Sequence, residues 1–149
     1  MQIGIFDITY NTLPCLHLIK KINIKKNECT CDEDIVAALN RELMYNKLSS
    51  EHIYALAMNY NMEPLGLILA GVGTCSKCDA DLRTLAIGLL LLGAEWFMCF
   101  HNHPNGNRTV SKSDRELTGY YKHLGEAIGI EFVRHLMIAR NTFEICEEL

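Results

Sequence analysis

The sequence predicts an α/β fold in which a mixed β-sheet is flanked by helices. Segments that alternate in polarity or are continuously apolar, as strands are, are interleaved with segments of helical periodicity. Two of the predicted strands are separated only by a turn, so we expect them to form an antiparallel hairpin in the middle of the chain. This mixture favours a sandwich with a mixed sheet over an all-parallel one. The 149 residues are enough for one domain, residues 1–149, with a sizeable core.

The first predicted elements are one strand and one helix. Residues 13–24 are rich in β-branched and aliphatic residues that partly alternate, which is typical of a strand. We assign residues 1–30 to an N-terminal extension in which this strand lies at the sheet edge. Residues 32–48 are predicted to be an amphipathic helix, because acidic residues occupy the first turn and one stripe is apolar. The stripe consists of Ile35, Leu39 and Leu43.

The predicted hairpin follows this helix. Residues 51–59 alternate and read as a mostly buried strand, residues 61–64 form a turn, and residues 65–70 form the partner strand. The glycines at 71 and 73 end the pattern. The remaining chain alternates between helix and strand. It is predicted to contain an apolar helix at 81–92, a short buried strand at 96–102, a helix at 111–128 and strands at 132–139 and 142–146.

The composition is that of a soluble globular protein, with 49% hydrophobic and 21% charged residues. No apolar run approaches the ~18 residues that a membrane-spanning helix needs, so no membrane association is expected. The first residues, Met1 to Gly4, lack the basic start and cleavage site of a secretory signal. A cytoplasmic location is therefore expected.

The charge distribution gives little support for nucleic-acid binding. The formal net charge is −4, whereas affinity for nucleic acid rests mainly on basic groups that neutralise phosphates. The only basic cluster consists of Lys20, Lys21, Lys25 and Lys26. We interpret it as the solvated face of the edge strand.

The seven cysteines have two notable spacings, Cys29-Thr-Cys31 and Cys75-Ser-Lys-Cys78. Together they could form a four-thiolate structural zinc site if the fold brought them together. The first spacing is tighter than usual for such a site, and 43 residues separate the pairs. Reduced cysteines in loops are the favoured interpretation, because no signal peptide points to an oxidising compartment.

The most informative segment is His-Asn-His-Pro-Asn-Gly at residues 101–106. Residues i and i+2 of a strand project to the same face, so His101 and His103 can direct two imidazoles at one point. Pro104 and the following Asn-Gly end the strand, which leaves that point at the sheet edge and open to solvent. Imidazole is a good zinc ligand, although an isolated pair of this kind is more often a surface turn or a buried, satisfied pair.

A second element, Ser111-Lys-Ser-Asp114, follows eight residues after His103. On its own it reads as a capping box at the start of a helix. The carboxylate of Asp114 can also turn towards the two histidines, and the two roles can coexist. Three ligands would leave a fourth tetrahedral position for water, as in catalytic zinc sites. Zinc lowers the pKa of bound water to about 7, and a nearby carboxylate usually moves the proton.

These elements resemble the JAB/MPN (JAMM) metalloprotease domains, and in particular their RadC-like branch. His-Asn-His-Pro-Asn-Gly followed by Ser-Lys-Ser-Asp is similar to the two motifs of that family, and Glu51 opens a strand as the family glutamate does. The resemblance covers residues 30–146. Further matching positions are Gly73-Thr74, Arg83 and His135.

The resemblance implies a three-layer-like, cytidine-deaminase-like sandwich and a single catalytic zinc ion held by His101, His103 and Asp114. It also implies that Glu51 is the general acid/base and that Ser111 stabilises the oxyanion. Spacing alone does not identify Glu51. The implied function is a zinc-dependent peptidase or isopeptidase whose substrate is a protein or peptide, with a ubiquitin-like conjugate as one option.

The chain departs from the family pattern at three places near the expected cleft. Asp81-Leu82 replaces His-Pro, Val110 replaces a common proline, and Arg134 stands where an aspartate is common. No helix-hairpin-helix region is recognised in residues 1–30. Two alternatives stay open at this point: a DNA-associated accessory protein of a mobile element, and a metal-dependent nuclease. A homodimer formed through a sheet edge or the helix at 81–92 is also compatible with the sequence.

Overall fold

The computed structural model describes residues 1–75 and 78–149 and is built on one seven-stranded mixed sheet. The strand order is β2-β1-β4-β3-β5-β6-β7. The pairs β1/β4 and β5/β6 are parallel, and the other neighbours are antiparallel. The strands are β1 (Gln2–Asn11), β2 (Leu13–Asn23), β3 (His52–Met58), β4 (Pro64–Val72), β5 (Trp96–Asn102), β6 (Glu131–Ala139) and β7 (Thr142–Ile145).

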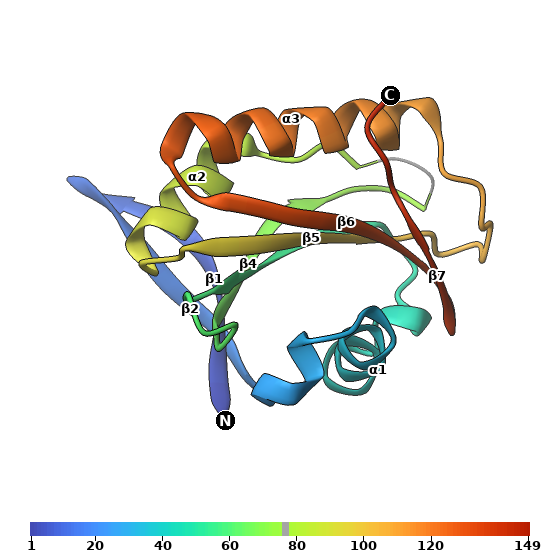
Figure 1. The fold of residues 1–149 in the computed structure, drawn as a ribbon, viewed down its shortest axis with the longest axis horizontal. Helices are drawn as coiled ribbons and strands as arrows, with labels where there is room; N and C mark the ends of the chain where they lie inside the picture. The colour runs from blue at the N-terminus through green and yellow to red at the C-terminus, as the bar shows by residue number, and fades with distance from the viewer. Residues whose placement is uncertain (76–77) are drawn as a thin grey trace.

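Helices cover both faces of this sheet (Figure 1). α1 (Asp32–Leu43) lies on one face, together with the short 3₁₀ turns η1 (Lys26–Cys29) and η2 (Tyr45–Lys47). α2 (Leu82–Leu91) and α3 (Lys112–Ile128) lie on the other face. The apolar core is divided accordingly, with Leu39 of α1 in one cluster and Leu85 of α2 in the other. The prediction of an α/β sandwich with a mixed sheet is confirmed.

The N-terminal extension contributes two strands, whereas the sequence analysis predicted one. β2 lies at the edge of the sheet as predicted, but β1 lies inside it, between β2 and β4. Ile3 and Ile5 of β1 are buried, and their alternation is the signal that was missed. The predicted solvation of the lysine cluster agrees with the structure, because all four lysines are exposed.

The predicted helix at 32–48 is too long at its C-terminal end. α1 ends at Leu43 because Met44 adopts the left-handed conformation (φ 52°), which interrupts helical hydrogen bonding. The chain then forms η2, which places Tyr45 in the core at 1% exposure. Its hydroxyl lies within hydrogen-bonding distance of the carbonyls of His52 and Phe100. Burial of this ring against two strands is a tertiary interaction that helical periodicity does not report.

Three features of the fold set the position of the candidate site. β3 and β5 are antiparallel neighbours in which Ile53 pairs with His101, so the start of β3 lies beside the end of β5. The loop after β5 leads into α3, whose N-terminus returns to the same place. None of the described helices is long and apolar enough to cross a membrane.

Candidate metal centre

His101, His103 and Asp114 converge where β5 ends and α3 begins. The Nε2 atoms of His101 and His103 are 3.1 Å apart. Asp114 places Oδ1 3.3 Å from Nε2 of His101 and Oδ2 3.4 Å from Nε2 of His103. The three side chains that the sequence analysis singled out as ligands are thus brought together from two elements.

These separations are close to those between the ligands of a tetrahedral zinc ion, with the two distances to Asp114 involving different oxygens of its carboxylate. Ligand bonds of ~2.0–2.1 Å imply ligand atoms ~3.3–3.4 Å apart, and the observed separations are 3.1, 3.3 and 3.4 Å. Two imidazoles and one carboxylate are also a donor set that zinc accepts in catalytic sites. The residues therefore fit the metal that the resemblance implies.

A second group of possible ligands, His101, His135 and Cys146, is fully buried. Nδ1 of His101 and Nε2 of His135 are only 2.7 Å apart. That separation is well below the ~3.3 Å between two ligands of one tetrahedral zinc ion, and it is typical of a hydrogen bond. Burial also raises the pKa of the Cys146 thiol to about 12. We therefore assign the candidate metal site to the first group.

His103 is held by a hydrogen bond on its far side. Its Nδ1 lies 2.8 Å from the carbonyl oxygen of Asn107, which can only accept, so the ring proton is on Nδ1 and Nε2 is free for a metal. The backbone N–H of His103 donates to the carbonyl oxygen of Ile138 (2.8 Å). The hydrogen bond with Asp114 raises the pKa of His103, and this effect outweighs the opposing effect of burial.

Asp114 serves two purposes at the start of α3. It closes a capping box, in which the Ser111 N–H donates to Oδ2 of Asp114 (2.8 Å) and the Asp114 N–H donates to the Ser111 hydroxyl (3.1 Å). The same carboxylate faces the two histidines. Burial favours its neutral form, but the hydrogen bonds of His101 and His103 prevail and hold the pKa of Asp114 well below its usual range. Cap and ligand geometry coexist here, as the sequence analysis allowed.

Glu51 lies one residue before β3 and is 8% exposed. Its backbone is fixed by two hydrogen bonds, from its N–H to Thr74 and from the Gly73 N–H to its carbonyl, each 2.8 Å long. Among the described residues, no hydrogen bond to its carboxylate is found. Burial raises the pKa of this carboxyl group, with a partly opposing effect of the nearby histidines. A raised pKa and an unpaired carboxylate are typical of a general base.

Asn102 supports the backbone around Glu51, a role that was not predicted from the sequence. Its amide oxygen accepts from the His52 N–H (2.7 Å), and its amide nitrogen donates to the Ser50 carbonyl (3.1 Å). The side chain thus holds both residues that flank Glu51 against the end of β5. Its position between the two histidines was visible in the sequence, but its role depends on the pairing of β3 with β5.

The centre opens into a cleft of about 880 Å³. One wall is formed by the loop after β5 and the first turns of α3, and the other by residues that precede α2. Four carboxylates and no lysine or arginine line the described part of the cleft. The lining acidic residues are Glu51, Asp79, Asp114 and Glu116.

The two cysteine pairs lie in different parts of the molecule. Cys75 and Cys78 line the cleft, whereas Cys29 and Cys31 flank the start of α1, on the opposite face of the sheet. Among the residues that the structure describes, no metal-binding group combines the pairs. All four are free thiols, and Cys29 is buried in η1.

The departures from the family pattern have local structural roles. Asp81 is the N-cap of α2 and accepts a hydrogen bond from the Thr84 N–H (3.0 Å). Arg134 forms an ion pair with Asp32 at the start of α1. Val110 packs against the small cluster at the end of β6. None of the three is among the groups that converge at the metal centre.

The chain is similar to known proteins over most of its length. The model of the RadC-like JAB domain matches residues 29–148. The chain belongs to the RadC-like JAB-domain family. Curated relatives include UPF0758 proteins of Desulforamulus reducens (31% identity over 76% of this chain and 49% of the relative) and of Halalkalibacterium halodurans (29% identity over 78% and 49%, respectively).

A UPF0758 protein of Listeria monocytogenes is similar to the same degree, with 30% identity over 76% of this chain and 50% of the relative. The chain thus spans about half the length of the curated relatives it matches. The names of these relatives assign no activity. The domain match establishes the family. Because the relatives' names give no activity, the reaction is inferred from the residues of the site.

Proposed function

We propose that this RadC-like JAB domain is a zinc-dependent hydrolase that cleaves amide or isopeptide bonds. The observation that carries the proposal is the convergence of two imidazole nitrogens and a carboxylate at separations of 3.1–3.4 Å, beside the buried side chain of Glu51. Three protein ligands are typical of zinc sites that act in catalysis, whereas structural sites use four.

His101, His103 and Asp114 would hold the ion. When bound, zinc would supply Lewis acidity, which brings the pKa of water from about 15.7 to about 7 and polarises a carbonyl group. Hydrogen bonds orient two of these ligands: Asn107 orients His103, and the capping box orients Asp114.

Glu51 is the proposed proton carrier. Its carboxylate would accept a proton from the attacking water as the oxygen of that water bonds to the acyl carbon. It would then deliver the proton to the leaving nitrogen as the C–N bond breaks. The products are a carboxylic acid and an amine, the acid gives up its remaining proton at neutral pH so that the final products are a carboxylate and an ammonium group, and Glu51 returns to its starting state. Burial suits Glu51 to this role, because burial raises the pKa of its carboxyl group towards neutral pH, where a general acid/base is most effective.

Ser111 is the proposed oxyanion donor. Its hydroxyl lines the cleft next to Asp114 and accepts one hydrogen bond, from the Asp114 N–H. The hydroxyl proton is therefore available to donate to the oxygen of a tetrahedral intermediate. Such a donor typically contributes a factor of about 10²–10³ to the rate.

The proposed substrate is a protein or peptide segment, with an isopeptide-linked conjugate of a ubiquitin-like modifier as one option. A cleft of about 880 Å³ has the volume for an extended segment of a few residues. The acidic lining argues against the DNA-associated alternative and against a nuclease, because both would need to accommodate phosphates.

The test is hydrolysis by the zinc-loaded protein of a peptide library and of ubiquitin-like isopeptide conjugates, with products detected by mass spectrometry. Glu51→Gln should bind zinc and lose activity, whereas the matched control Glu126→Gln should keep both, since Glu126 is exposed on α3 and pairs with His123. Hydrolysis by Glu51→Gln at the wild-type rate would refute the mechanism. Salt-sensitive binding of DNA without any hydrolysis would favour the alternative.

A further inference from the structure

A continuous chain of hydrogen bonds runs behind the proposed metal ligands. Nδ1 of His101 lies 2.7 Å from Nε2 of His135, and Nδ1 of His135 lies 2.8 Å from the hydroxyl of Thr118. The Thr118 hydroxyl in turn donates to the backbone carbonyl of Asp114 (3.0 Å), with the carbonyl of Cys146 at 3.3 Å. The chain thus starts at one proposed ligand and ends at the backbone of another.

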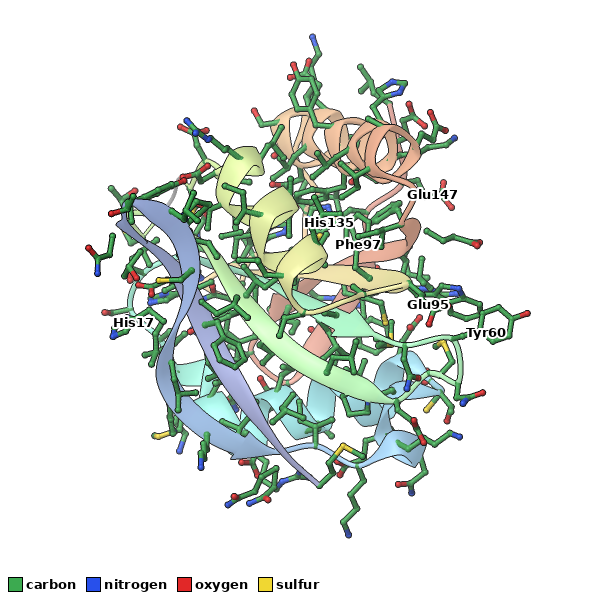
Figure 2. All side chains as sticks on the ribbon, turned by 90° about the vertical axis from the view of Figure 1, so that its left-hand side faces the viewer. His17, Tyr60, Glu95, Phe97, His135 and Glu147 are labelled. Atoms are coloured by element: carbon green, nitrogen blue, oxygen red, sulfur yellow. The ribbon has the colours of Figure 1, made fainter. Side chains whose placement is uncertain are left out.

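His135 lies in the interior of the protein, with an exposed fraction of 0%. Figure 2 shows it inside the molecule, whereas Tyr60 and Glu147 lie at the periphery. Both ring nitrogens of His135 have partners, and neither partner is charged negatively. An imidazolium at this position would be a buried charge with no carboxylate in contact, which is costly, so the ring is neutral and carries one proton.

The metal fixes where that proton lies. Nε2 of His101 faces His103 and Asp114, so coordination through Nε2 leaves the proton of His101 on Nδ1. Nδ1–H of His101 must then donate to Nε2 of His135, which places the proton of His135 on Nδ1. That N–H donates to Thr118, whose hydroxyl donates onward to a backbone carbonyl. With His101 coordinated through Nε2, every donor in the chain would find an acceptor in only this direction.

We infer that His135 and Thr118 are positioning residues for the metal centre. They would hold His101 in the tautomer and orientation that present Nε2 to zinc, and fix the first turn of α3 relative to β5. The inference rests on the proposed metal site and extends it to groups that touch neither metal nor substrate. Partners of this kind commonly matter to metal ligands, and their loss typically weakens metal affinity by 10–100-fold.

The geometry separates this role from simple packing. A residue that only fills the core needs the right volume, whereas the proposed role needs a hydrogen-bond acceptor at the position of Nε2. Tyr121 offers a matched comparison, because its ring packs edge-on against His135 (5.1 Å between centroids, 84°). Within residues 1–75 and 78–149, its hydroxyl has no hydrogen-bond partner. Tyr121 therefore shares the environment of His135 without belonging to the chain.

The first test measures zinc and cobalt affinity by competition with a chromophoric chelator. His135→Leu, which keeps volume and removes the acceptor, should weaken binding by about 10–100-fold and alter the visible absorption spectrum of the bound cobalt. His135→Gln, whose amide oxygen can accept from His101, should recover most of the affinity. Thr118→Val should weaken binding, Thr118→Ser should not, and Tyr121→Phe should match wild type.

A second test needs no variant and covers the case in which His135→Leu fails to fold. Long-range ¹H–¹⁵N correlation spectra of the zinc-loaded protein should show His135 neutral with its proton on Nδ1. A proton on Nε2, or wild-type affinity in a folded His135→Leu, would overturn the inference. If the wild-type protein binds no metal, the proposed function itself fails, which is a different and distinguishable result.

Discussion

Replacing Glu51 with glutamine should stabilise the metal-free protein while abolishing the proposed hydrolase activity. Glu51 is 8% exposed, its carboxylate accepts no hydrogen bond from the described residues, and burial raises its pKa against the partly opposing effect of His101 and His103. These are unfavourable surroundings for a negative charge. Glutamine keeps the shape of the side chain and removes that charge.

The size of the effect follows from the burial of the group. Leaving a buried polar group without a partner costs about 1–3 kcal/mol, and more when it is charged. Glutamine leaves a neutral amide in the same place, so only part of this penalty is relieved. We expect the free energy of unfolding to rise by about 1 kcal/mol. For a chain of this size, the melting temperature should rise by roughly 2–4 °C.

The effect should depend on pH in a defined direction. Because burial raises the pKa of Glu51 in the folded state, the folded protein binds this proton more tightly than the unfolded chain does. Wild-type stability from this group is therefore fully present below the unfolded pKa of ~4.3 and falls as pH rises through the folded value. Glutamine does not titrate, so its advantage should be present at neutral pH and absent below about pH 4.

The assay is urea denaturation of metal-stripped wild type and Glu51→Gln across this pH range. Other titrating groups are common to both proteins and cancel in the difference. Glu126→Gln, an exposed change on α3, should stay within about 0.5 kcal/mol of wild type at every pH. If Glu51→Gln is no more stable than wild type at neutral pH, or its advantage does not vary with pH, Glu51 is not a strained, desolvated carboxylate.

Substitutions at Asn102 and Ser111 test the roles proposed for these two side chains. Asn102→Ala should lower the free energy of unfolding by about 1–3 kcal/mol, because it leaves the His52 N–H without its partner and removes one of the two hydrogen bonds to the Ser50 carbonyl; a loss below about 0.5 kcal/mol in urea denaturation would argue against this role. Ser111→Ala should cost about 1 kcal/mol of stability through loss of the cap and slow hydrolysis by about 10²–10³-fold. A variant that lost stability but kept the full rate would exclude Ser111 as an oxyanion donor.

Much of the fold was predictable because its elements carry local signals. The buried strand at 96–102 matches β5, and the capping box at Ser111 marks the start of α3. β1 was missed because only Ile3 and Ile5 of its ten residues are buried hydrophobics. The end of α1 was misplaced because Tyr45 is held in the core by contacts with β3 and with β5, and β5 lies far from it in sequence.

The residues of the candidate site also fall into two groups: those that local spacing predicts and those that depend on tertiary packing. The spacing of His101 and His103 on a strand and the proximity of Asp114 follow from local geometry, and the structure brings all three together. Glu51 was reached only through a family resemblance, since its place beside the centre depends on the register of β3 against β5. Asn102, Thr118 and the hydrogen bond of His135 depend on three-dimensional packing, and no sequence spacing reports them.

The most direct test of the central claim is calorimetric titration of the metal-stripped protein with zinc. The account predicts that one ion binds per chain. It further predicts that His101→Ala and His103→Ala each lose this binding, while His17→Ala, a change in an exposed histidine of β2, retains it. Absence of zinc binding by the wild-type protein, or undiminished binding by the His101 and His103 variants, would contradict the account.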